Sequence, residues 1–202
     1  WRDIKTPPKQ PKVSSGNLAF VPYTSGTTGD PKGVMHNHDA VLSSYFGRYK
    51  FSSYQTGDRV ACNIFFIWEF LRPLLEGGTV YVIPDDVIFL PRSLTRFISQ
   101  NGIAEILFTP SLLQGILNSA DTETLRAALA SLRVVWLNGE VVTATCLEQA
   151  LDVFPKTCRV FNTYSISETH DVCTVDLNIL PLDGIEVCPV GLPMDGVTVR
   201  VL

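Results

Sequence analysis

The chain has 202 residues, 46 % of them apolar, and its 16 Lys and Arg residues against 20 Asp and Glu residues give a formal net charge of −4. A chain of this length buries about 70 % of the surface that its unfolded form exposes, which excludes a small disulfide scaffold. The weakly acidic balance, without a basic cluster, argues against nucleic acid or an anionic membrane surface as a partner.

The longest apolar stretch runs from Val60 to Leu75, and polar residues and a proline interrupt it. It therefore predicts a buried strand followed by a helix instead of a membrane span. The chain begins with Trp1 and shows no signal peptide, so we expect it to belong to something longer.

Five widely spaced cysteines, none in a Cys-x-x-Cys pair, predict reduced and mostly buried thiols and a cytoplasmic location. A zinc site is the less favoured interpretation, because the chain has only three histidines and none has ligand spacing. The cysteines are Cys62, Cys146, Cys158, Cys173 and Cys188.

Residues 1–16 are rich in Pro, Lys and Ser and predict a linker or surface strap, so the fold is expected to begin at Asn17. Short β-rich runs then alternate with helix-length segments. Strands are expected at 18–23, 59–63, 79–83, 105–108, 133–137 and 159–164. Helices are expected at 38–50, 66–76, 91–101, 110–119, 122–131 and 143–153, with Thr122 and Thr143 as N-caps and Gly77 and Gly102 as stops.

This alternation predicts an α/β fold with a mainly parallel sheet covered by helices on both faces. After Asp171 the pattern changes to strand-like runs separated by Pro and Gly, VCTVDL and GVTVRVL among them, without helices. We expect a smaller antiparallel sheet there, packed beside the first.

The most informative segment is YTSGTTGDPKGV, from Tyr23 to Val34. Three glycines and four hydroxyl residues after an apolar strand can wrap a polyphosphate with backbone amides and hydroxyls, and Lys32 supplies the positive charge. A Gly/Ser surface turn is the alternative, but the hydroxyl density and the lysine argue against it. A common P-loop needs Lys between Gly and Ser or Thr, whereas Lys32 lies between Pro31 and Gly33.

This segment closely resembles the phosphate loop of adenylate-forming enzymes, the family of acyl-CoA synthetases, luciferases and non-ribosomal peptide synthetase adenylation domains. Three further motifs follow in the family's order. Leu137 to Glu140 resembles its Gly-Gly-Glu turn, Asn162 to Thr169 its Tyr-Gly-x-Thr-Glu segment, and Val190 to Pro193 its Gly-x-Pro turn. The chain most resembles an adenylation domain of a peptide synthetase or carboxylate-reductase multienzyme. Residues 17–202 would then form part of the large N-terminal domain, without the C-terminal lid domain.

The resemblance implies that a small carboxylic acid attacks the α-phosphorus of ATP, giving an acyl-adenylate and pyrophosphate. A phosphopantetheine thiol on a carrier domain of the same polypeptide would then take the acyl group. The alternatives are a nucleotide-binding fragment without activity of its own, an acyl-CoA synthetase acting on an aryl or aliphatic acid, and a P-loop ATPase, which is the weakest. We expect the 202 residues alone to be inactive, because the family's lid lysine and ribose-binding Asp are absent.

The resemblance also implies residue roles. Lys32, Ser167 and Glu168 form the catalytic set, with Glu168 as the Mg²⁺ ligand and Ser167 on the α-phosphate. Tyr164 stacks on adenine while Asn162 reads its exocyclic amine. The nucleotide-binding set is Thr24, Ser25, Gly26, Thr27, Thr28, Gly29, Lys32, Asn138, Gly139, Glu140, Asn162, Tyr164 and Ser167.

Two positions depart from the family's pattern, since Asn138 and Ser165 stand where it has Gly. Both residues are small and polar, and Asn tolerates positive φ, so neither is expected to close the nucleotide site. His36 and His38 receive no catalytic role, because a carboxylate substrate is already ionised. His170 is expected to be a satisfied polar residue instead of a ligand.

The acyl pocket that the resemblance implies comprises Ile64, Phe65, Trp68, Leu107, Trp136, Asn138, Thr163, Asp171 and Val172. Family members that activate α-amino acids place an Asp at the position of Ile64, so that ammonium anchor is missing here. Three aromatic residues and Asp171 suit a methylated ammonium, because aromatic faces attract cations and a buried unpaired carboxylate needs one. The open alternative is that Phe65, Trp68 and Trp136 belong to the core or line an apolar slot for a neutral acid.

Overall fold

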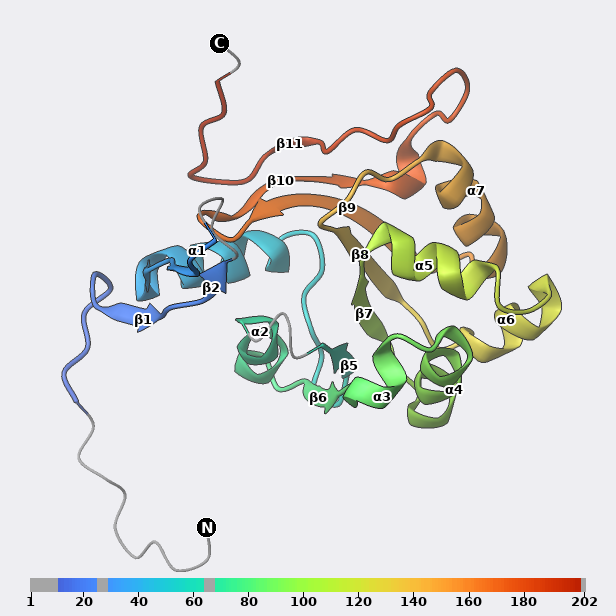
Figure 1. The fold of residues 1–202 in the computed structure, drawn as a ribbon, viewed down its shortest axis with the longest axis horizontal. Coiled ribbons are helices and arrows are strands. Elements are labelled where there is room, and N and C mark those ends of the chain that lie inside the picture. The colour runs from blue at the N-terminus through green and yellow to red at the C-terminus, as the bar shows by residue number, and fades with distance from the viewer. Residues whose placement is uncertain (1–10, 25–28, 64–67, 201–202) are drawn as a thin grey trace, which may run out of the picture.

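The structure is a computed structural model that describes residues 11–24, 29–63 and 68–200. Its centre is a seven-stranded sheet with the order β11-β10-β9-β8-β7-β5-β6 (Figure 1). The strands are β5 (Arg59–Cys62), β6 (Thr79–Val82), β7 (Glu105–Phe108), β8 (Val134–Asn138), β9 (Arg159–Ile166), β10 (His170–Asp176) and β11 (Leu192–Pro193).

The five strands β5 to β9 run parallel, whereas β10 is antiparallel to β9 and β11 to β10. The α/β class is therefore confirmed, and so is an antiparallel portion at the end of the chain. The expectation that this portion is a separate sheet is wrong, because a tight turn after β9 lets β10 pair with the open edge of the same sheet. The run expected from residue 196 onward forms no strand over the described residues 196–200.

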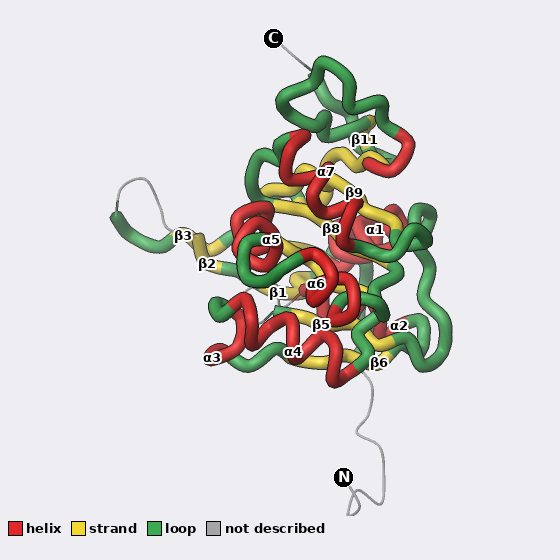
Figure 2. Tube along the Cα trace, turned by 90° about the vertical axis from the view of Figure 1, so that its right-hand side faces the viewer, coloured by secondary structure: helices red, strands yellow, loops and turns green. Residues whose placement is uncertain are grey.

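Helices cover both faces of the sheet, as the alternation predicted. Figure 1 places α1 and α2 on one side and α3 to α7 on the other, and Figure 2 shows α4, α5, α6 and α7 stacked along their side. The helices are α1 (His38–Tyr49), α2 (Leu71–Leu75), α3 (Asp85–Ile88), α4 (Pro91–Asn101), α5 (Pro110–Leu117), α6 (Thr122–Ala128) and α7 (Ala144–Val153), and a 3₁₀ turn follows β10 at Leu177–Ile179.

The ends of the helices follow local capping chemistry. Thr143 caps α7 as expected, and Gly102 ends α4 in the left-handed conformation at φ 57°. The cap of α6 is Asp121 and not Thr122, because the Asp121 carboxylate accepts from Thr124 N at 2.9 Å. Helix α2 is shorter than the expected 66–76, part of which lies outside the described residues, and α3 was not expected.

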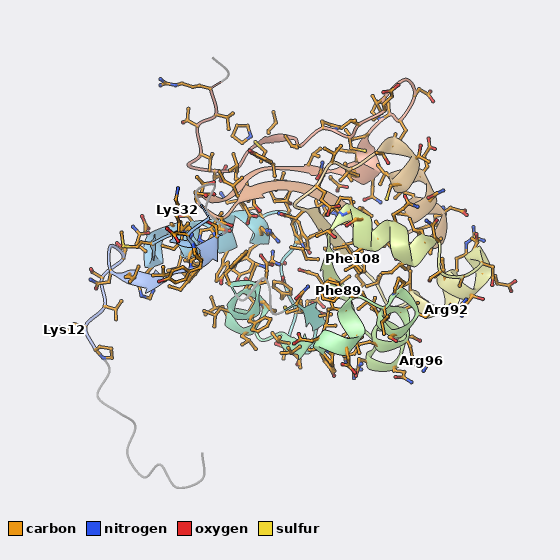
Figure 3. The ribbon with its side chains drawn as sticks, viewed as in Figure 1. Lys12, Lys32, Phe89, Arg92, Arg96 and Phe108 are labelled. Carbon is orange, nitrogen blue, oxygen red and sulfur yellow. The ribbon has the colours of Figure 1, made fainter. Side chains whose placement is uncertain are left out.

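Alternation along β8 divides the core between the two faces of the sheet. Val135 and Leu137 pack with α4, α5 and α7, in the same cluster as the fully buried Phe108 of β7 (Figure 3). Val134 and Trp136 point to the other face, where they pack with Phe161 of β9. All five residues of β8 are buried, so this strand is covered on both sides, as is typical of parallel sheets.

Two small antiparallel pairs precede the main sheet. Strand β1 (Leu18–Phe20) pairs with β4 (His36–Asn37), and β2 (Tyr23–Thr24) pairs with β3 (Lys32–Gly33). Residues 11–16 are exposed and form neither helix nor strand. None of the helices in the described ranges is long and apolar enough to cross a membrane. All five cysteines are buried, as the sequence predicted.

Candidate functional site

The sequence's phosphate loop begins and ends in the β2–β3 hairpin. Thr24 lies opposite Lys32 in this hairpin, and Lys32 is exposed (Figure 3). Gly29 has φ 93°, a conformation that glycine adopts without strain. Ser25, Gly26, Thr27 and Thr28 lie outside the described residues.

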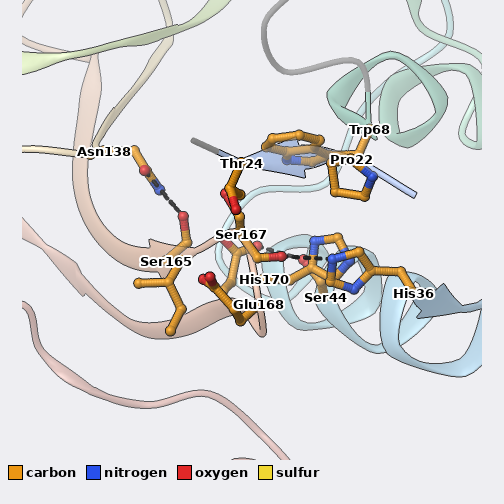
Figure 4. Close-up of a pocket in the computed structure, with 13 residues that line it drawn as sticks. Pro22, Thr24, His36, Ser44, Trp68, Asn138, Ser165, Ser167, Glu168 and His170 are labelled. Atoms are coloured by element: carbon orange, nitrogen blue, oxygen red, sulfur yellow. Dashed lines mark hydrogen bonds between the residues drawn. The ribbon is translucent and has the colours of Figure 1, made fainter. Parts of the chain in front are cut away.

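A cavity of about 370 Å³ opens beside this hairpin, where β8, β9 and the start of β10 meet α1 (Figure 4). It collects five residues that the sequence assigned to the nucleotide or to catalysis, one of which, Asn138, it also assigned to the acid, and two that it assigned to the acid alone. The first group is Thr24, Asn138, Gly139, Ser167 and Glu168, and the second is Trp68 and Asp171. Pro22, His36, Ser44, Ser165, Ile166 and His170 complete the lining. We call this space the first cavity.

A second cavity of about 390 Å³ lies next to the first, and Gly139, Ser165 and Ile166 line both. It brings together four further residues of the predicted nucleotide and acid sets, Glu140, Asn162, Thr163 and Tyr164. Tyr164 is half exposed on this wall. A flat aromatic side chain beside polar groups is the arrangement that a purine base requires.

The two departures from the family's pattern contact each other at the border of the cavities. Asn138 Nδ2 donates to Ser165 Oγ at 2.8 Å, a bond drawn in Figure 4. Gly139 follows at φ 90° and leaves the border open, while the Glu140 carboxylate accepts from Ser111 N at 2.8 Å and fixes the start of α5. The substitutions therefore tie β8 to β9 without closing either cavity.

The turn Ser167–Thr169 joins β9 to β10 and places the Glu168 side chain on the first cavity. His36 Nε2 donates to Ser167 O at 2.7 Å, so a side chain from β4 holds the turn (Figure 4). The ring of His170 packs 4.0 Å from the ring of His36, and burial lowers the pKa of His170 to about 4. The expectation that His170 is satisfied is not met among the described residues, where its buried Nε2 has no hydrogen-bond partner.

Beneath the first cavity lies a buried network of charged side chains. Arg48 of α1 binds Asp171 through two bonds, from Nε at 2.8 Å and from Nη2 at 2.6 Å. Ser44 Oγ donates to the same carboxylate at 2.6 Å, and Glu69 contacts both Arg48 and Arg72. Burial by itself would raise the pKa of Asp171, but the Arg48 guanidinium and the Ser44 hydroxyl hold it below its usual value.

Trp136 belongs to this network and not to a ligand cage. Its ring stacks on Phe161 with centroids 4.4 Å apart, while the guanidinium carbons of Arg48 and Arg72 lie 4.8 and 5.5 Å from its centroid. Its Nε1 donates to Glu105 at 2.9 Å, and burial raises the pKa of that carboxyl group. The ring is only 1 % exposed, so it cannot contact a substrate cation.

The predicted acyl pocket is therefore only partly assembled. Trp68, Asn138 and Asp171 line the first cavity, but Asp171 is not the unpaired carboxylate that the sequence predicted, because Arg48 binds it. Thr163 faces the second cavity, and Leu107 lines a separate apolar groove beside α5. Val172 lines neither of these two cavities, and Ile64 and Phe65 lie outside the described residues.

Sequence reasoning missed the residues that pair with the predicted ones. Arg48, Glu69, Arg72 and Glu105 are 5 % exposed or less, yet each stands in a segment that reads as an ordinary amphipathic helix or strand. One signal was present: Glu105 opens an otherwise apolar strand, and a charge at such a position calls for a buried partner.

Two adjoining cavities, one with a carboxylate and hydroxyls and one with an aromatic wall, at the carboxyl ends of parallel strands are typical of a nucleotide-binding α/β enzyme. The chain belongs to the AMP-binding enzyme family, whose model matches residues 1–202.

Curated relatives include the glycine betaine reductase ATRR of Emericella nidulans, 46 % identical over 178 residues, which cover 88 % of this chain and 14 % of that protein. Bacitracin synthase 2 of Bacillus licheniformis is 30 % identical over 196 residues, covering 94 % of this chain and 7 % of that protein. The chain thus spans a small part of the length of either relative.

Solved structures share the fold. VinN with L-aspartate superimposes with a TM-score of 0.79 at 23 % identity, covering 100 % of this chain and 50 % of that one. The Vibrio cholerae adenylation domain AlmE, in complex with glycyl-adenosine-5'-phosphate, gives 0.77 at 22 % identity, covering 89 % and 34 %. The expected architecture, part of an adenylate-forming domain, agrees with both.

Proposed function

We propose that these residues supply the nucleotide and acid sites of an enzyme that activates a small carboxylic acid with ATP as an acyl-adenylate and releases pyrophosphate. The observation that carries the proposal is the pair of cavities that meet at Gly139 and Ser165. One has an aromatic wall for a base, and the other has hydroxyls and a carboxylate beside an enclosed floor. An acyl-adenylate needs these two compartments side by side.

The roles of the residues follow from this placement. Thr24 and Lys32 hold the β- and γ-phosphates together with the loop between them, and Ser167 binds the α-phosphate. Tyr164 packs against adenine. Asn162 uses its Nδ2 on Pro189 O at 2.9 Å, so its Oδ1 is the atom that accepts from the exocyclic amine of adenine.

The residues present fit Mg²⁺, the cation that the family implies. Glu168 is exposed and directs a carboxylate to the first cavity, which Thr24 also lines. No group of three His, Cys, Asp or Glu side chains that could hold a metal occurs in the described ranges. One carboxylate plus substrate phosphate oxygens and water is a common way for proteins to bind Mg²⁺. The bound ion would neutralise charge on the phosphate oxygens.

For the acid we propose a small betaine-like carboxylate. The support is the likeness to a protein named glycine betaine reductase, the missing ammonium anchor at Ile64, and the wall that Trp68 forms in the first cavity. Trp68 stacks on Phe20 in that wall, with ring centroids 6.4 Å apart, and presents a π-surface to a cation. An aryl or aliphatic acid is the alternative that the same apolar wall admits.

We further propose that the acyl group passes to a phosphopantetheine thiol on a carrier domain. The matched peptide synthetases are multidomain proteins, and this chain covers only a few per cent of their length. We also propose that these 202 residues alone do not catalyse the reaction.

The experiment is ATP–pyrophosphate exchange by the full-length protein with glycine betaine, alanine, benzoate and hexanoate. We expect exchange that depends on glycine betaine, and Glu168→Gln should lower its rate about 10²–10³-fold because a charge that balances phosphate oxygens is lost. Glu148→Gln, an exposed position on α7, is the matched control. ATP hydrolysis without any acid would favour an ATPase, and nucleotide binding without exchange would favour a binding module.

A further inference from the structure

His170 occupies a backbone position that side chains rarely adopt. Its φ is 61°, and among the described residues it is the one non-glycine residue with a positive φ. It follows the turn Ser167–Thr169, in which Thr169 N donates to Ile166 O at 3.1 Å. Few residue types tolerate this left-handed conformation, and such backbone strain is concentrated at functional sites.

The unusual φ changes where the side chains of β10 point. Successive residues of a strand normally face opposite sides of the sheet. His170 and Asp171 are consecutive, yet both are buried and both line the first cavity. The register of β9 and β10 also shifts between Asp171 and Cys173. The hairpin is therefore built to present two neighbouring polar side chains to one cavity.

Aromatic rings surround the imidazole of His170, and its Nε2 lacks a hydrogen-bond partner among the described residues. The ring centroids of Phe20 and Trp68 lie 5.6 and 6.3 Å from the centroid of His170, both edge-on to it, and that of His36 lies 4.0 Å away. His36 uses its own Nε2 on Ser167 O. His170 Nε2 is buried and has no partner within the described ranges, although buried polar atoms in proteins are almost always hydrogen-bonded. A ligand in the first cavity is the partner that this atom lacks.

We propose that His170 Nε2–H donates a hydrogen bond to the carboxylate of the acid substrate, while the substrate's cationic group lies against Trp68. This inference rests on the proposed function and assigns a specificity residue within that site. A quaternary ammonium has neither an N–H nor a lone pair on nitrogen, so the carboxylate is the only group of a betaine that accepts a hydrogen bond. The cationic group then depends on the ring of Trp68, because Arg48 already binds the Asp171 carboxylate.

The test uses full-length protein with His170→Gly and His170→Asn. Glycine suits a φ of 61°, so His170→Gly removes the imidazole while relieving backbone strain, and Asn tolerates the same φ. His38→Asn, at the start of α1 and outside both cavities, is the matched control. We measure the KM for glycine betaine and for ATP in exchange, and the binding of glycine betaine and of ethyltrimethylammonium by calorimetry.

Loss of a hydrogen bond to a charged group should raise the KM and Kd for glycine betaine about 10- to 100-fold. The KM for ATP and the binding of ethyltrimethylammonium, which lacks the carboxylate, should not change, and added imidazole should partly rescue His170→Gly. Unchanged glycine betaine binding in His170→Gly would overturn the inference. So would a parallel rise in both KM values, which would place the bond on the α-phosphate or the turn.

The calorimetry also separates this inference from the proposed function. If the wild-type protein binds glycine betaine but shows no exchange, the proposed adenylation fails, and the comparison of Kd values still decides the role of His170. If the wild-type protein does not bind glycine betaine, the inference is overturned.

Discussion

The buried ion pair between Arg48 and Asp171 makes a quantitative prediction about stability. Arg48→Met keeps most of the length of the side chain but leaves the Asp171 carboxylate, 7 % exposed, with the Ser44 hydroxyl as its remaining hydrogen-bond donor from α1. Removing one member of a buried pair costs about 3–5 kcal/mol, because the remaining charge stays desolvated. For a domain of this size each kcal/mol corresponds to about 2–4 °C, so the melting temperature should fall by about 6–20 °C.

The stabilisation that the Arg48–Asp171 pair provides depends on pH. In the wild-type protein the pKa of Asp171 is below its usual value, so the pair stabilises the fold above the unfolded pKa of about 3.9 and that contribution is lost as the pH falls. In Arg48→Met, burial should instead raise the folded-state pKa of Asp171 above its unfolded value of about 3.9. The difference in the free energy of unfolding should therefore be largest near pH 7 and shrink towards pH 4.

The assay is thermal and denaturant unfolding of wild type, Arg48→Met, Asp171→Leu and the double variant at pH 7 and pH 4.5. The double variant should recover part of the loss, since the orphaned carboxylate is gone. Arg126→Met, which breaks an ion pair with Asp152 that is about half exposed, is the control and should cost less than about 1 kcal/mol. An Arg48→Met variant no less stable than this control, or a loss that does not depend on pH, would refute the reasoning.

Two further predictions concern the core and the Gly-x-Pro turn. Trp136→Leu should lower the free energy of unfolding by about 2–4 kcal/mol. The preference for a betaine over benzoate in exchange should not change, because the ring reaches neither cavity. A selective loss of activity with the betaine would show that Trp136 binds the cation. Gly191→Ala should destabilise by about 1–3 kcal/mol, because its φ is 85° and a Cβ would meet Thr174 O at 2.2 Å. Gly196→Ala has a φ of 80° with open space around it, so denaturant unfolding should show a smaller loss there; equal losses would mean that the contact with Thr174 has no role.

Local patterns account for what the sequence predicted well. The phosphate-loop, Asn162–Thr169 and Gly-x-Pro motifs are short and depend on backbone conformations that few residue types adopt, so they can be recognised along the chain. The parallel order of the sheet followed from strands that alternate with helices. Glu168 lines the first cavity and Tyr164 lines the second, each beside other residues of the predicted nucleotide set.

The errors arose where a residue's role depends on a partner far away in the sequence. Asp171 reads as an unpaired carboxylate until Arg48, 123 positions earlier, is seen to bind it. Trp136 reads as a cage residue until two guanidinium groups are found on its ring. Likewise, nothing local shows that His170 adopts a positive φ, since histidine in a strand-like run is usually extended.

Strand β9 pairs in parallel with β8 on one side and antiparallel with β10 on the other. Its own residues Asn162 and Tyr164 face the cavity proposed for adenine, whereas His170 and Asp171 of β10 face the cavity proposed for the acid. The proposed function thus gives recognition of the shared cosubstrate to a strand in the interior of the sheet. The same proposal gives recognition of the variable acid to β10, the neighbour across one turn, so we expect an exchange of residues 170–172 to alter the choice of acid while the base-binding strand keeps its neighbours.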